Sequence, residues 1–499
     1  MFPIKSIILA SGIWLLASVS QAFEPAVVSA HPAATEAGMQ ILKQGGSAAD
    51  AAIATAFALT VVEPHNSGIG GGGFLLYYEA KKGRFSFVDY REVAPLRADP
   101  KFYEKDPRYL RRGIRSVAVP GFLKGMETVH ERWKKLSWPE VVAPSIGLAR
   151  KGVPIQGKLW DRINKALPYL QFDPESNRLF AEPFKTQGWL NQADLAKTLE
   201  SIQTGGASLF YEGELGQKLV GYMKEAGGII SAADLKNYKV YFRKPFQFEY
   251  KNYTIFSSPS PSSGGMGLNF LFNRAMINEL AKQPPQSLQA FELIVTSFRE
   301  YFDFRDVALG DTPDNVLAHT THLCVIDAEG NIAAMTNTLN EPFGSGVTLP
   351  GTGIVLNNEM NDFSLKPNTA NRIRPGARPL SSMAPTIVLK NNFPQLVIGS
   401  PGGITIPLNL FQVLFYHWEW NLPLADAIRY PKLYYASQSD EILLEEGVSK
   451  KTRQLFGPDK KIKNFPSIGN VQALIIHNDR DTETFSDPRG EGRGLTASP

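Results

Sequence analysis

The chain has 499 residues, of which 43% are hydrophobic and 20% are charged. That balance is typical of an ordinary globular protein whose core can be large, and the length suits about two to four small domains. Lysine and arginine number 52 against 48 aspartate and glutamate residues, and no long basic run is present. We therefore expect no nucleic-acid partner.

The N-terminus has the layout of a signal peptide. Lys5 precedes an apolar run from Ile7 to Val19, and Ser20-Gln21-Ala22 offers small residues for cleavage before Phe23. A single membrane anchor is the alternative, but the run is short of the roughly 20 apolar residues that a spanning helix needs. We expect residues 1–22 to be a signal peptide, the protein to be secreted or periplasmic, and no stable membrane span.

The single cysteine, Cys324, excludes an intramolecular disulfide. No His or Asn pattern around it indicates a Cys–His nucleophile, so we expect a buried strand residue. The 7 histidines are scattered and no Cys/His cluster has zinc spacing. We predict no metal and no cofactor.

In chain order, the first predicted elements are helices over 35–43 and about 48–61. The second follows Ser47-Ala48-Ala49-Asp50, which has the pattern of a capping box, and its alanine content suits burial against a sheet. The glycines 70–73 are not followed by Lys-Ser or Lys-Thr, which argues against a phosphate loop. They more readily allow the backbone to approach a ligand or a packed strand.

The next segments predict strands over 74–78 and 84–89 and then a long region of helical periodicity from Val117 to about Leu309. A strand over 250–257 and a turn over 259–265 interrupt that region. Its helices are predicted over 124–134, 139–151, 192–203 and 213–226, with a second capping box at 231–234. Strands and helices without a regular βαβ alternation predict an α/β or α+β fold in layers.

A β-hairpin is predicted around the loop Ala328-Glu329-Gly330, between two runs rich in Thr, Val and Ile. The last residue of such a loop has to tolerate positive φ, and a glycine is there. If Asp327 faces Asn331, then Thr320 lies directly across from Thr338.

The two-residue strand period places Thr336, Thr338 and Asn340 on one face, so hydroxyls and an amide gather around Thr320. Facing threonines occur in many sheets, and the hairpin alone also fits a purely structural strand pair. The decision between a catalytic and a structural role depends on the rest of the chain.

Seven short motifs follow one another along the chain. They are Glu63-Pro64 through Gly70-Gly71-Gly72-Gly73-Phe74, Asp89-Tyr90-Arg91-Glu92-Val93-Ala94-Pro95, Pro261-Ser262-Ser263-Gly264-Gly265, Thr320-Thr321-His322, Asn357-Asn358-Glu359-Met360-Asn361-Asp362-Phe363, Arg378-Pro379-Leu380-Ser381-Ser382-Met383 and Gly399-Ser400-Pro401-Gly402-Gly403. Each is weak alone, but the ordered set resembles the γ-glutamyltransferases (γ-glutamyltranspeptidases) of the N-terminal-nucleophile hydrolase superfamily. The resemblance spans nearly the whole chain after residue 22.

The resemblance implies a four-layer αββα sandwich with the nucleophile at the end of a central strand. It also implies autocatalytic cleavage of the His319–Thr320 bond into a large subunit (23–319) and a small subunit (320–499) that form one fold. Thr320 then becomes an N-terminal residue whose α-amine serves as the base, because a threonine hydroxyl is a weak nucleophile on its own.

The resemblance assigns the remaining roles residue by residue. Thr338 matches the threonine that hydrogen-bonds the nucleophile, and Gly402 and Gly403 match the oxyanion-hole glycines. Arg91, Ser381 and Ser382 match the family residues that bind the substrate α-carboxylate. Asn340, Glu359 and Asp362 match the family residues around the substrate α-amine. The residues alone allow a simpler interpretation of each motif. Arg91 could be a solvated surface arginine, and Gly402-Gly403 could be an ordinary turn. Glu359 and Asp362 could lie in a solvated loop.

Two segments are shorter than their counterparts in the family. The segment from Asp362 to Ser381 is too short for an active-site lid, so we expect an open cleft that admits water and long substrates such as poly-γ-glutamate. The segment from Gly310 to His319 is shorter than the usual linker, which bears on the rate of processing.

The implied function is an exported, self-processing hydrolase or transferase that cleaves the γ-glutamyl amide of glutathione or a related donor. It passes the acyl group to water, an amino acid or a peptide through a γ-glutamyl-Thr320 ester. One alternative is a glutaryl or cephalosporin acylase, which has no α-amine to bind, so the presence of Asn340, Glu359 and Asp362 argues against it. The other is a non-catalytic exported binding relative, and the presence of Thr320, Thr338, Gly402 and Gly403 argues against it.

Overall fold

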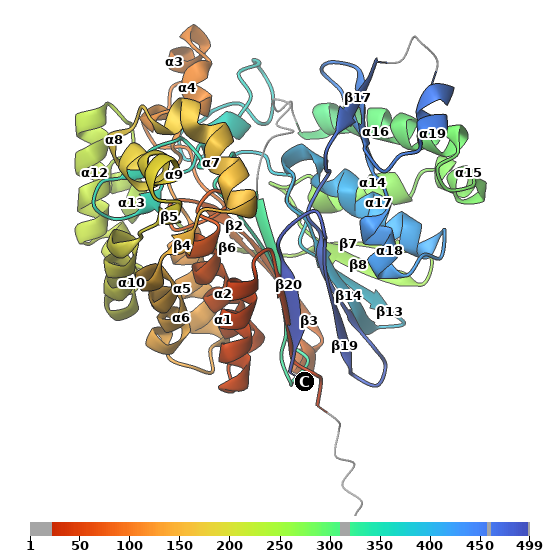
Figure 1. Cartoon of the computed structure of the whole chain (residues 1–499), viewed down its shortest axis with the longest axis horizontal. Coiled ribbons are helices and arrows are strands. Elements are labelled where there is room, and N and C mark those ends of the chain that lie inside the picture. Colours follow the sequence, from red (N-terminus) through yellow and green to blue (C-terminus); the bar gives the residue numbers. More distant parts are fainter. Residues whose placement is uncertain (1–21, 310–319, 457–460, 498–499) are drawn as a thin grey trace, which may run out of the picture.

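The computed structural model describes residues 22–309, 320–456 and 461–497, and in this part of the chain two sheets lie face to face between two layers of helices (Figure 1). The first sheet has seven antiparallel strands and the second has six. The αββα expectation is therefore confirmed. The first sheet runs in the order β20 (Arg493–Thr496), β1 (Ala26–Ser29), β9 (Thr320–Ile326), β10 (Ile332–Thr338), β2 (Gly72–Glu79), β3 (Arg84–Tyr90) and β6 (Tyr241–Arg243). The second runs in the order β19 (Thr482–Ser486), β18 (Gln472–Ile476), β14 (Phe393–Gly399), β13 (Thr386–Lys390), β8 (Tyr253–Ser257) and β7 (Phe246–Tyr250).

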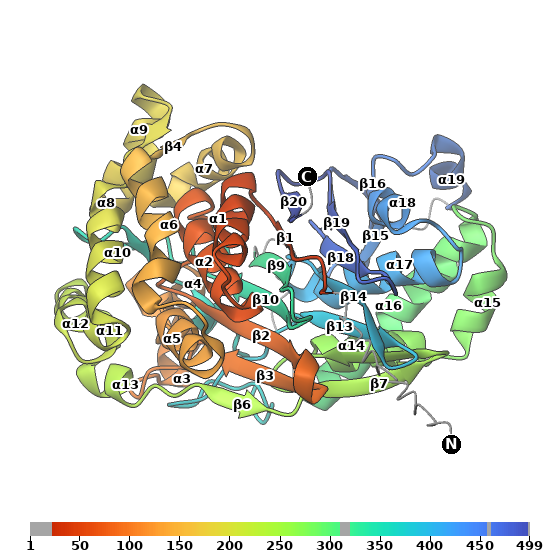
Figure 2. The same cartoon turned by 90° about the horizontal axis from the view of Figure 1, so that it is seen from below.

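Helices on either flank cover the outer faces of the two sheets (Figure 2). On the flank of the first sheet are α1 (Pro32–Lys43), α2 (Ala48–Val62), α3 (Pro100–Lys105), α4 (Arg108–Arg111), α5 (Phe122–Trp133), α6 (Trp138–Lys151), α7 (Gly157–Leu170), α8 (Pro174–Ser176), α9 (Glu182–Thr186), α10 (Ala193–Gly205), α11 (Ser208–Tyr211), α12 (Glu214–Ala226) and α13 (Ala232–Lys236). On the other flank are α14 (Gly264–Phe272), α15 (Met276–Lys282), α16 (Leu288–Leu309), α17 (Ile406–Trp418), α18 (Leu424–Arg429) and α19 (Lys450–Leu455). Smaller sheets pair β4 (Val153–Pro154) with β5 (Trp189–Leu190), β11 (Thr348–Leu349) with β12 (Ile354–Val355), and β15 (Leu433–Ala436) with β16 (Glu441–Glu445) and β17 (Lys461–Phe465).

Both sheets draw strands from each side of residue 320. In the first sheet β9 and β10 lie between β1 and β2, and in the second β13 pairs with β8. The segments 22–309 and 320–497 therefore share one fold. The proposed cut at His319–Thr320 remains a prediction, because His319 lies outside the described residues, as do residues 1–21 of the predicted signal peptide.

The alanine-rich helix α2 is buried along its whole length. Its capping box is confirmed, because the Ser47 side chain accepts from the Asp50 N–H while the Asp50 carboxylate accepts from the Ser47 N–H. Small side chains let this helix pack closely against the first sheet, and α2 lies on β9 and β10. Every helix in the described part of the chain is too short or too polar to span a bilayer.

The central hairpin has the predicted register. Thr320 pairs with Thr338, and the Asp327 N–H donates to the Asn331 carbonyl at 3.1 Å. Gly330 closes the loop with φ of 81°, the left-handed conformation that glycine adopts without strain. The two-residue period turns the even-numbered residues of β9 and β10 toward the second sheet, and Thr320 therefore faces the space between the sheets.

One predicted element was wrong. The segment 250–257 is not a single strand, because Lys251 adopts φ of 52° and turns the chain between β7 and β8. Tyr250 consequently ends β7 and pairs with Tyr253 across the turn.

Candidate active site

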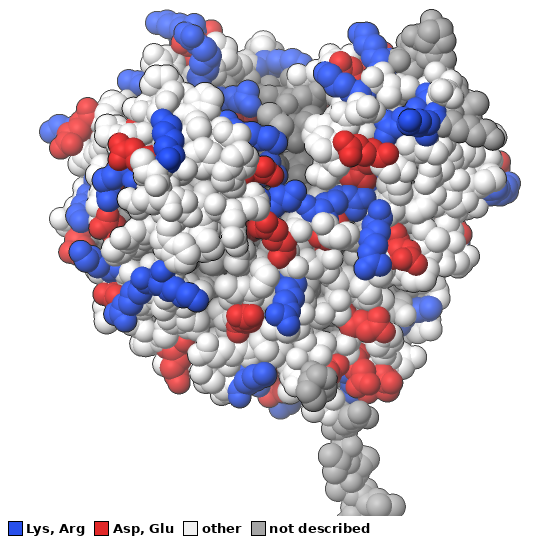
Figure 3. Space-filling model, in the orientation of Figure 1, with Lys and Arg blue, Asp and Glu red and all other residues white. Residues whose placement is uncertain are grey.

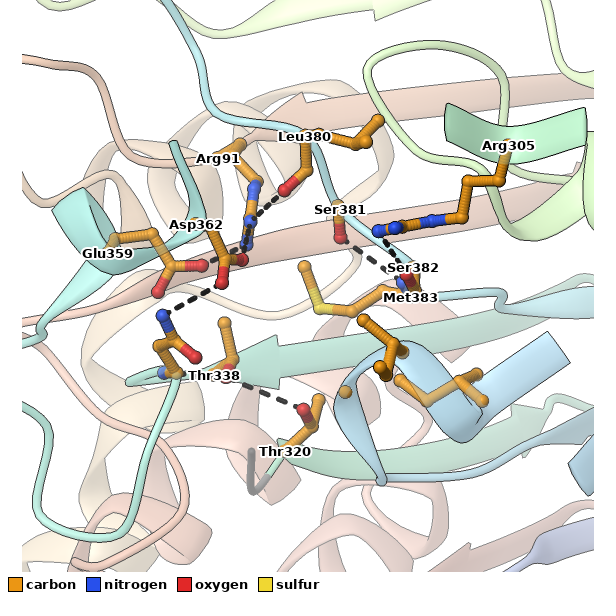
Figure 4. A pocket seen from close by; sticks show the side chains of 14 residues that line it. Arg91, Arg305, Thr320, Thr338, Glu359, Asp362, Leu380, Ser381, Ser382 and Met383 are labelled. Carbon is orange, nitrogen blue, oxygen red and sulfur yellow. Dashed lines mark hydrogen bonds and ion pairs between the residues drawn. The ribbon is translucent and has the colours of Figure 1, made fainter. Parts of the chain in front are cut away.

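Thr320 is the first residue of β9 and faces Thr338 on β10 (Figure 4). The two hydroxyl oxygens are 3.5 Å apart, which is the outer limit of a hydrogen bond. The Thr338 hydroxyl also accepts from the Asn340 backbone N–H at 2.8 Å, so its position is held from the loop that follows. Both threonine side chains are nearly buried, at 3% exposed each.

Asn340 joins this site by a different route from the one predicted. The strand ends at Thr338, and Asn340 has φ of 74°, so its side chain does not follow the strand period. The amide nevertheless lines the pocket beside Thr320 and donates to Asp362 Oδ1 at 3.0 Å. Thr336 keeps to the strand face, but its hydroxyl contacts His322 Nδ1 at 2.8 Å.

Arg91 is a buried ion-pair partner, and the alternative of a solvated surface arginine is wrong. Its side chain is 1% exposed, it pairs with Glu359, and its Nη2 lies 2.5 Å from Asp362 Oδ2. The same nitrogen donates to the Leu380 carbonyl at 2.8 Å. Burial disfavours the charged guanidinium, yet Glu359 and then Asp362 raise the pKa of Arg91.

The two carboxylates come from a single 3₁₀ turn, Glu359–Asp362, and Glu359 is completely buried. Burial raises the pKa of the Glu359 carboxyl, and the Arg91 guanidinium opposes that shift. The solvated-loop alternative for this turn is therefore wrong for Glu359.

Ser381 and Ser382 lie on the other side of the pocket, in an extended segment that meets the chain around Ser262. The Ser381 hydroxyl accepts from the Met383 N–H at 3.1 Å, and the Ser382 hydroxyl accepts from Ser263 at 3.2 Å. The structure thus brings the predicted substrate-binding residues into one pocket with Thr320.

The sequence analysis missed Arg305, which reaches the same pocket from α16. Its side chain is 3% exposed. A signal was present, because Phe298, Tyr301 and Phe302 place the buried face of this helix under position 305. An arginine on an apolar helix face is uncommon without a partner or a ligand.

Gly402 and Gly403 form the turn that leads into α17. Their φ values are 138° and 54°, which side chains rarely adopt, and a Cβ on Gly402 would lie 2.5 Å from the Thr405 hydroxyl. Neither backbone N–H donates a hydrogen bond within the described residues. Each glycine lines a cavity that also contacts Thr320.

Two cavities meet at Thr320. The first, which we call the charged pocket, has a volume of about 30 Å³ and is lined by Arg91, Arg305, Thr338, Asn340, Glu359, Asp362, Ser381, Ser382 and Gly403. The second, the basic groove, has about 440 Å³ and is lined by Glu63, His65, Lys158, Arg162, Lys165, Gly402 and Arg489, among others. Figure 3 shows Lys and Arg side chains gathered beside the hollow between the two halves of the molecule.

Glu63 lies where the basic groove reaches the nucleophile strand. Its carboxylate accepts from the Thr321 hydroxyl at 3.1 Å. Complete burial raises the pKa of Glu63 to about 7, against opposing hydrogen bonds from Asn66 and Thr321. Arg162 is close enough to lower that pKa slightly without forming an ion pair.

Cys324 is the buried strand residue that was predicted, but it does have a histidine neighbour. His322 Nε2 lies 3.3 Å from Cys324 Sγ, because residues two apart on a strand share one face. Burial raises the pKa of the thiol far above its usual range and lowers that of His322 to about 3. Both groups are therefore neutral, and the pair cannot supply a thiolate.

The segment between Asp362 and Ser381 is anchored to the protein surface beside the site. Phe363 and Ile373 pack in a small hydrophobic cluster with Tyr103 and Leu110. The Asn371 side chain donates to the Asp362 carbonyl at 2.7 Å and accepts from the Leu380 N–H at 2.9 Å.

Known proteins resemble this chain over almost its full length. The sequence profile described as Gamma-glutamyltranspeptidase matches residues 34–319 and 313–497. A glutathione hydrolase proenzyme of Bacillus subtilis (strain 168) is 33% identical over 91% of this chain and 88% of its own. An Acylase ACY 1 proenzyme of Pseudomonas sp. (strain SE83) is 32% identical over 91% of this chain and 90% of its own.

Among solved structures, the cephalosporin acylase from Bacillus halodurans aligns with a TM-score of 0.81 over 99% of each chain. Its sequence identity is 24%, so this similarity supports the fold and not the substrate.

Proposed function

Because the chain belongs to the γ-glutamyltranspeptidase family of N-terminal-nucleophile hydrolases, we propose that it is a self-processing γ-glutamyl hydrolase and transferase acting on glutathione or a related donor. The observation that carries the proposal is the charge of the pocket beside Thr320. It combines two buried arginines with two carboxylates, and a γ-glutamyl group presents a carboxylate and an ammonium together.

Processing would begin with the Thr320 hydroxyl. Its oxygen attacks the carbonyl carbon of His319, the peptide C–N bond breaks as a C–O ester bond forms, and the amide nitrogen takes up the hydroxyl proton. Water then hydrolyses the ester, which leaves a carboxylate on His319 and a free α-amine and hydroxyl on Thr320. The shared sheets support the retention of both subunits in one particle.

In the mature enzyme the α-amine of Thr320, with a reference pKa of about 7.7–8.0, is suited to act as the base. It takes the hydroxyl proton as Oγ1 attacks the γ-carbonyl of the donor, and returns a proton to the leaving amine when the C–N bond breaks. The γ-glutamyl ester is then transferred to water or to an amine. The N–H groups of Gly402 and Gly403 donate no hydrogen bond to another described residue and are suited to stabilise the oxyanion.

The basic groove is suited to the leaving group and the acceptor. Lys158 and Arg162 are half-buried, Lys165 is exposed, and none of the three forms an ion pair within the described residues. The leaving group of glutathione ends in a carboxylate, and so do the next residues of a poly-γ-glutamate chain. The anchored segment after Asp362 is consistent with a site open to water, which favours hydrolysis.

A second candidate is an acylase that removes glutaryl side chains, and the similarity to Acylase ACY 1 proenzyme favours keeping it in the test. A glutaryl group carries no ammonium, so it would leave Glu359 and Asp362 without a charged partner from the substrate. We therefore place it second. Comparing γ-glutamyl-4-nitroanilide with glutaryl-4-nitroanilide distinguishes the two candidates.

We further propose that the protein is exported, with residues 1–22 removed as a signal peptide. The support is the layout of the first 23 residues. N-terminal sequencing of the large subunit from cells that express the full chain should give Phe23. A subunit that retains residues 1–22 would contradict removal of the signal peptide.

The first experiment is intact mass and N-terminal sequencing of the purified protein and of Thr320→Ala. We expect two chains in the wild type, the smaller beginning at Thr320, and one intact chain without hydrolytic activity in the variant. Thr254→Ala, on β8 of the second sheet, is the matched control and should process normally. A wild-type chain that stays intact after long incubation would leave Thr320 without its α-amine and would overturn the proposal.

A further inference from the structure

Two buried side chains at the inner end of the basic groove carry polar atoms that have no partner. His65 and Asn66 line the groove together with Thr320, and they are 2% and 8% exposed. In the described part of the chain, neither His65 Nδ1 nor Asn66 Oδ1 has a hydrogen-bond partner. A polar atom that is buried without a hydrogen bond destabilises the folded protein, so two such atoms beside a nucleophile indicate a ligand.

The turn that carries these side chains is fixed against the end of the nucleophile hairpin. The Leu339 N–H donates to the Asn66 carbonyl at 3.0 Å, directly after Thr338 at the end of β10. The Phe343 N–H donates to the His65 carbonyl at 3.0 Å. The two side chains are therefore held at a set place beside the strand pair that carries Thr320.

Both unpartnered atoms are suited to accept a hydrogen bond. The NH₂ group of Asn66 donates to the Glu63 carboxylate, which leaves the amide oxygen as the unpartnered atom. Burial lowers the pKa of His65 well below its ordinary value, and Arg162 lowers it further, so the ring is neutral. Its Nδ1 accepts a hydrogen bond in the tautomer that carries the proton on Nε2.

A ligand that satisfies both atoms has to donate two hydrogens. An uncharged primary amine does so and keeps its lone pair free for attack. The Arg162 guanidinium near His65 disfavours a second positive charge, so this environment favours the amine over the ammonium. The Glu63 carboxyl nearby is already bonded to Asn66 and Thr321.

We propose that His65 Nδ1 and Asn66 Oδ1 bind the amine of the acyl acceptor and direct its lone pair toward the ester on Thr320. The inference rests on the proposed γ-glutamyl transfer and assigns the reacting end of the acceptor. The acceptor releases its ammonium proton to water, and its nitrogen attacks the ester carbonyl carbon. A C–N bond forms, the C–O bond to Thr320 Oγ1 breaks, and one N–H proton passes through the Thr320 α-amine to Oγ1.

The test compares His65→Phe and Asn66→Leu with wild type, because each change keeps a side chain of similar size and removes one acceptor atom. The donor is γ-glutamyl-4-nitroanilide and the acceptor is glycylglycine. The ratio of γ-glutamylglycylglycine to glutamate should fall about tenfold in each variant, since one hydrogen bond to the amine is lost. Water carries no amine, and the ratio separates this loss from a general loss of activity.

Two surface changes of the same chemistry are the matched controls. Asn278→Leu is on the exposed side of α15, and His477→Phe replaces a ring that pairs with Glu483 at the surface. Both should keep the wild-type ratio within about twofold, as is usual for surface substitutions. A wild-type ratio in His65→Phe and Asn66→Leu would overturn the assignment.

A measurement on the wild-type protein keeps the test decisive if the two variants do not fold. Glycolylglycine and propionylglycine carry a hydroxyl and a methyl group where glycylglycine has its amine, and both keep its carboxylate. As inhibitors of transfer to glycylglycine, they should differ in Ki by about tenfold in favour of the hydroxyl, which donates one hydrogen bond. Equal Ki values would overturn the assignment.

Failure of the proposed function would look different. In that case the wild-type protein would not process itself or would form no γ-glutamylglycylglycine, whereas a wrong assignment of His65 and Asn66 leaves wild-type transfer intact.

Discussion

The charged pocket and the basic groove meet at Thr320, and they are built in opposite ways. The pocket is narrow, about 30 Å³ against about 440 Å³ for the groove. Its charges are buried, and Arg91 is bound to two carboxylates at once. The lysines and Arg162 of the groove have no ion-pair partner among the described residues and are partly open to solvent.

This difference has a physical consequence for specificity. Charges held in a dry pocket discriminate strongly between substrates, because a wrong ligand leaves them unpaired. Solvated charges attract anions of many shapes and are weakened by salt. We therefore expect a strict requirement for the acyl group and a loose one for the leaving group and the acceptor.

Removing a charge from the charged pocket should have the largest effect on the rate of γ-glutamyl hydrolysis. Asp362→Asn removes a negative charge that contacts Arg91 and the Asn340 amide, and we expect kcat/KM for γ-glutamyl-4-nitroanilide to fall about 100- to 1,000-fold. Self-processing should persist, because it uses Thr320 and not the ammonium site. The control is Asp303→Asn, an exposed residue of α16, and a loss below tenfold in Asp362→Asn would show that the pocket is not strict.

Removing a positive charge from the basic groove should have a moderate effect on the rate of transfer, and its size should depend on the acceptor. Arg162→Met should lower transfer to glycylglycine about three- to tenfold at low salt and leave transfer to glycylglycinamide, which lacks the carboxylate, nearly unchanged. Transfer rates measured by product analysis at two salt concentrations test this. Lys218→Met, an exposed change on α12, is the control, and equal losses with both acceptors would remove the electrostatic role of the groove.

The smallest effect on rate is expected at Glu63, where a pH-dependent change in stability should appear instead. Burial raises the pKa of Glu63 from its reference value of 4.5 to about 7. Between these values the folded protein holds a proton that the unfolded chain has released, so the free energy of unfolding falls as pH rises through this range. Glu63→Gln removes this titrating group, so the decrease in the free energy of unfolding over this pH range should be smaller by about 3 kcal/mol.

Thermal unfolding at pH 5 and pH 8 tests this prediction. The Tm of Glu63→Gln relative to wild type should be higher at pH 8 than at pH 5. Glu131→Gln on the surface of α5 should behave as wild type at both values. An identical pH dependence in Glu63→Gln and wild type would mean that the carboxyl is ionised throughout.

Local structure was predictable from the sequence where short-range rules decide it. The hairpin register followed from one glycine and the two-residue strand period, and it placed Thr320 opposite Thr338 correctly. The capping box of α2 followed in the same way. The split of 250–257 into β7 and β8 was missed, because a two-residue turn with Lys251 in the left-handed region has no glycine or proline to mark it.

The sequence by itself determined the family resemblance, the layered fold and the set of residues around the nucleophile. Only the tertiary structure decided how the charges pair, because ion pairs depend on distance in space and not along the chain. Arg91 meets Asp362 across 271 positions of sequence, and Arg305 meets Ser382 across 77. Folding places Arg91 against two carboxylates and Arg305 among hydroxyl groups, and that distinction depends on contact in space, which no local pattern records.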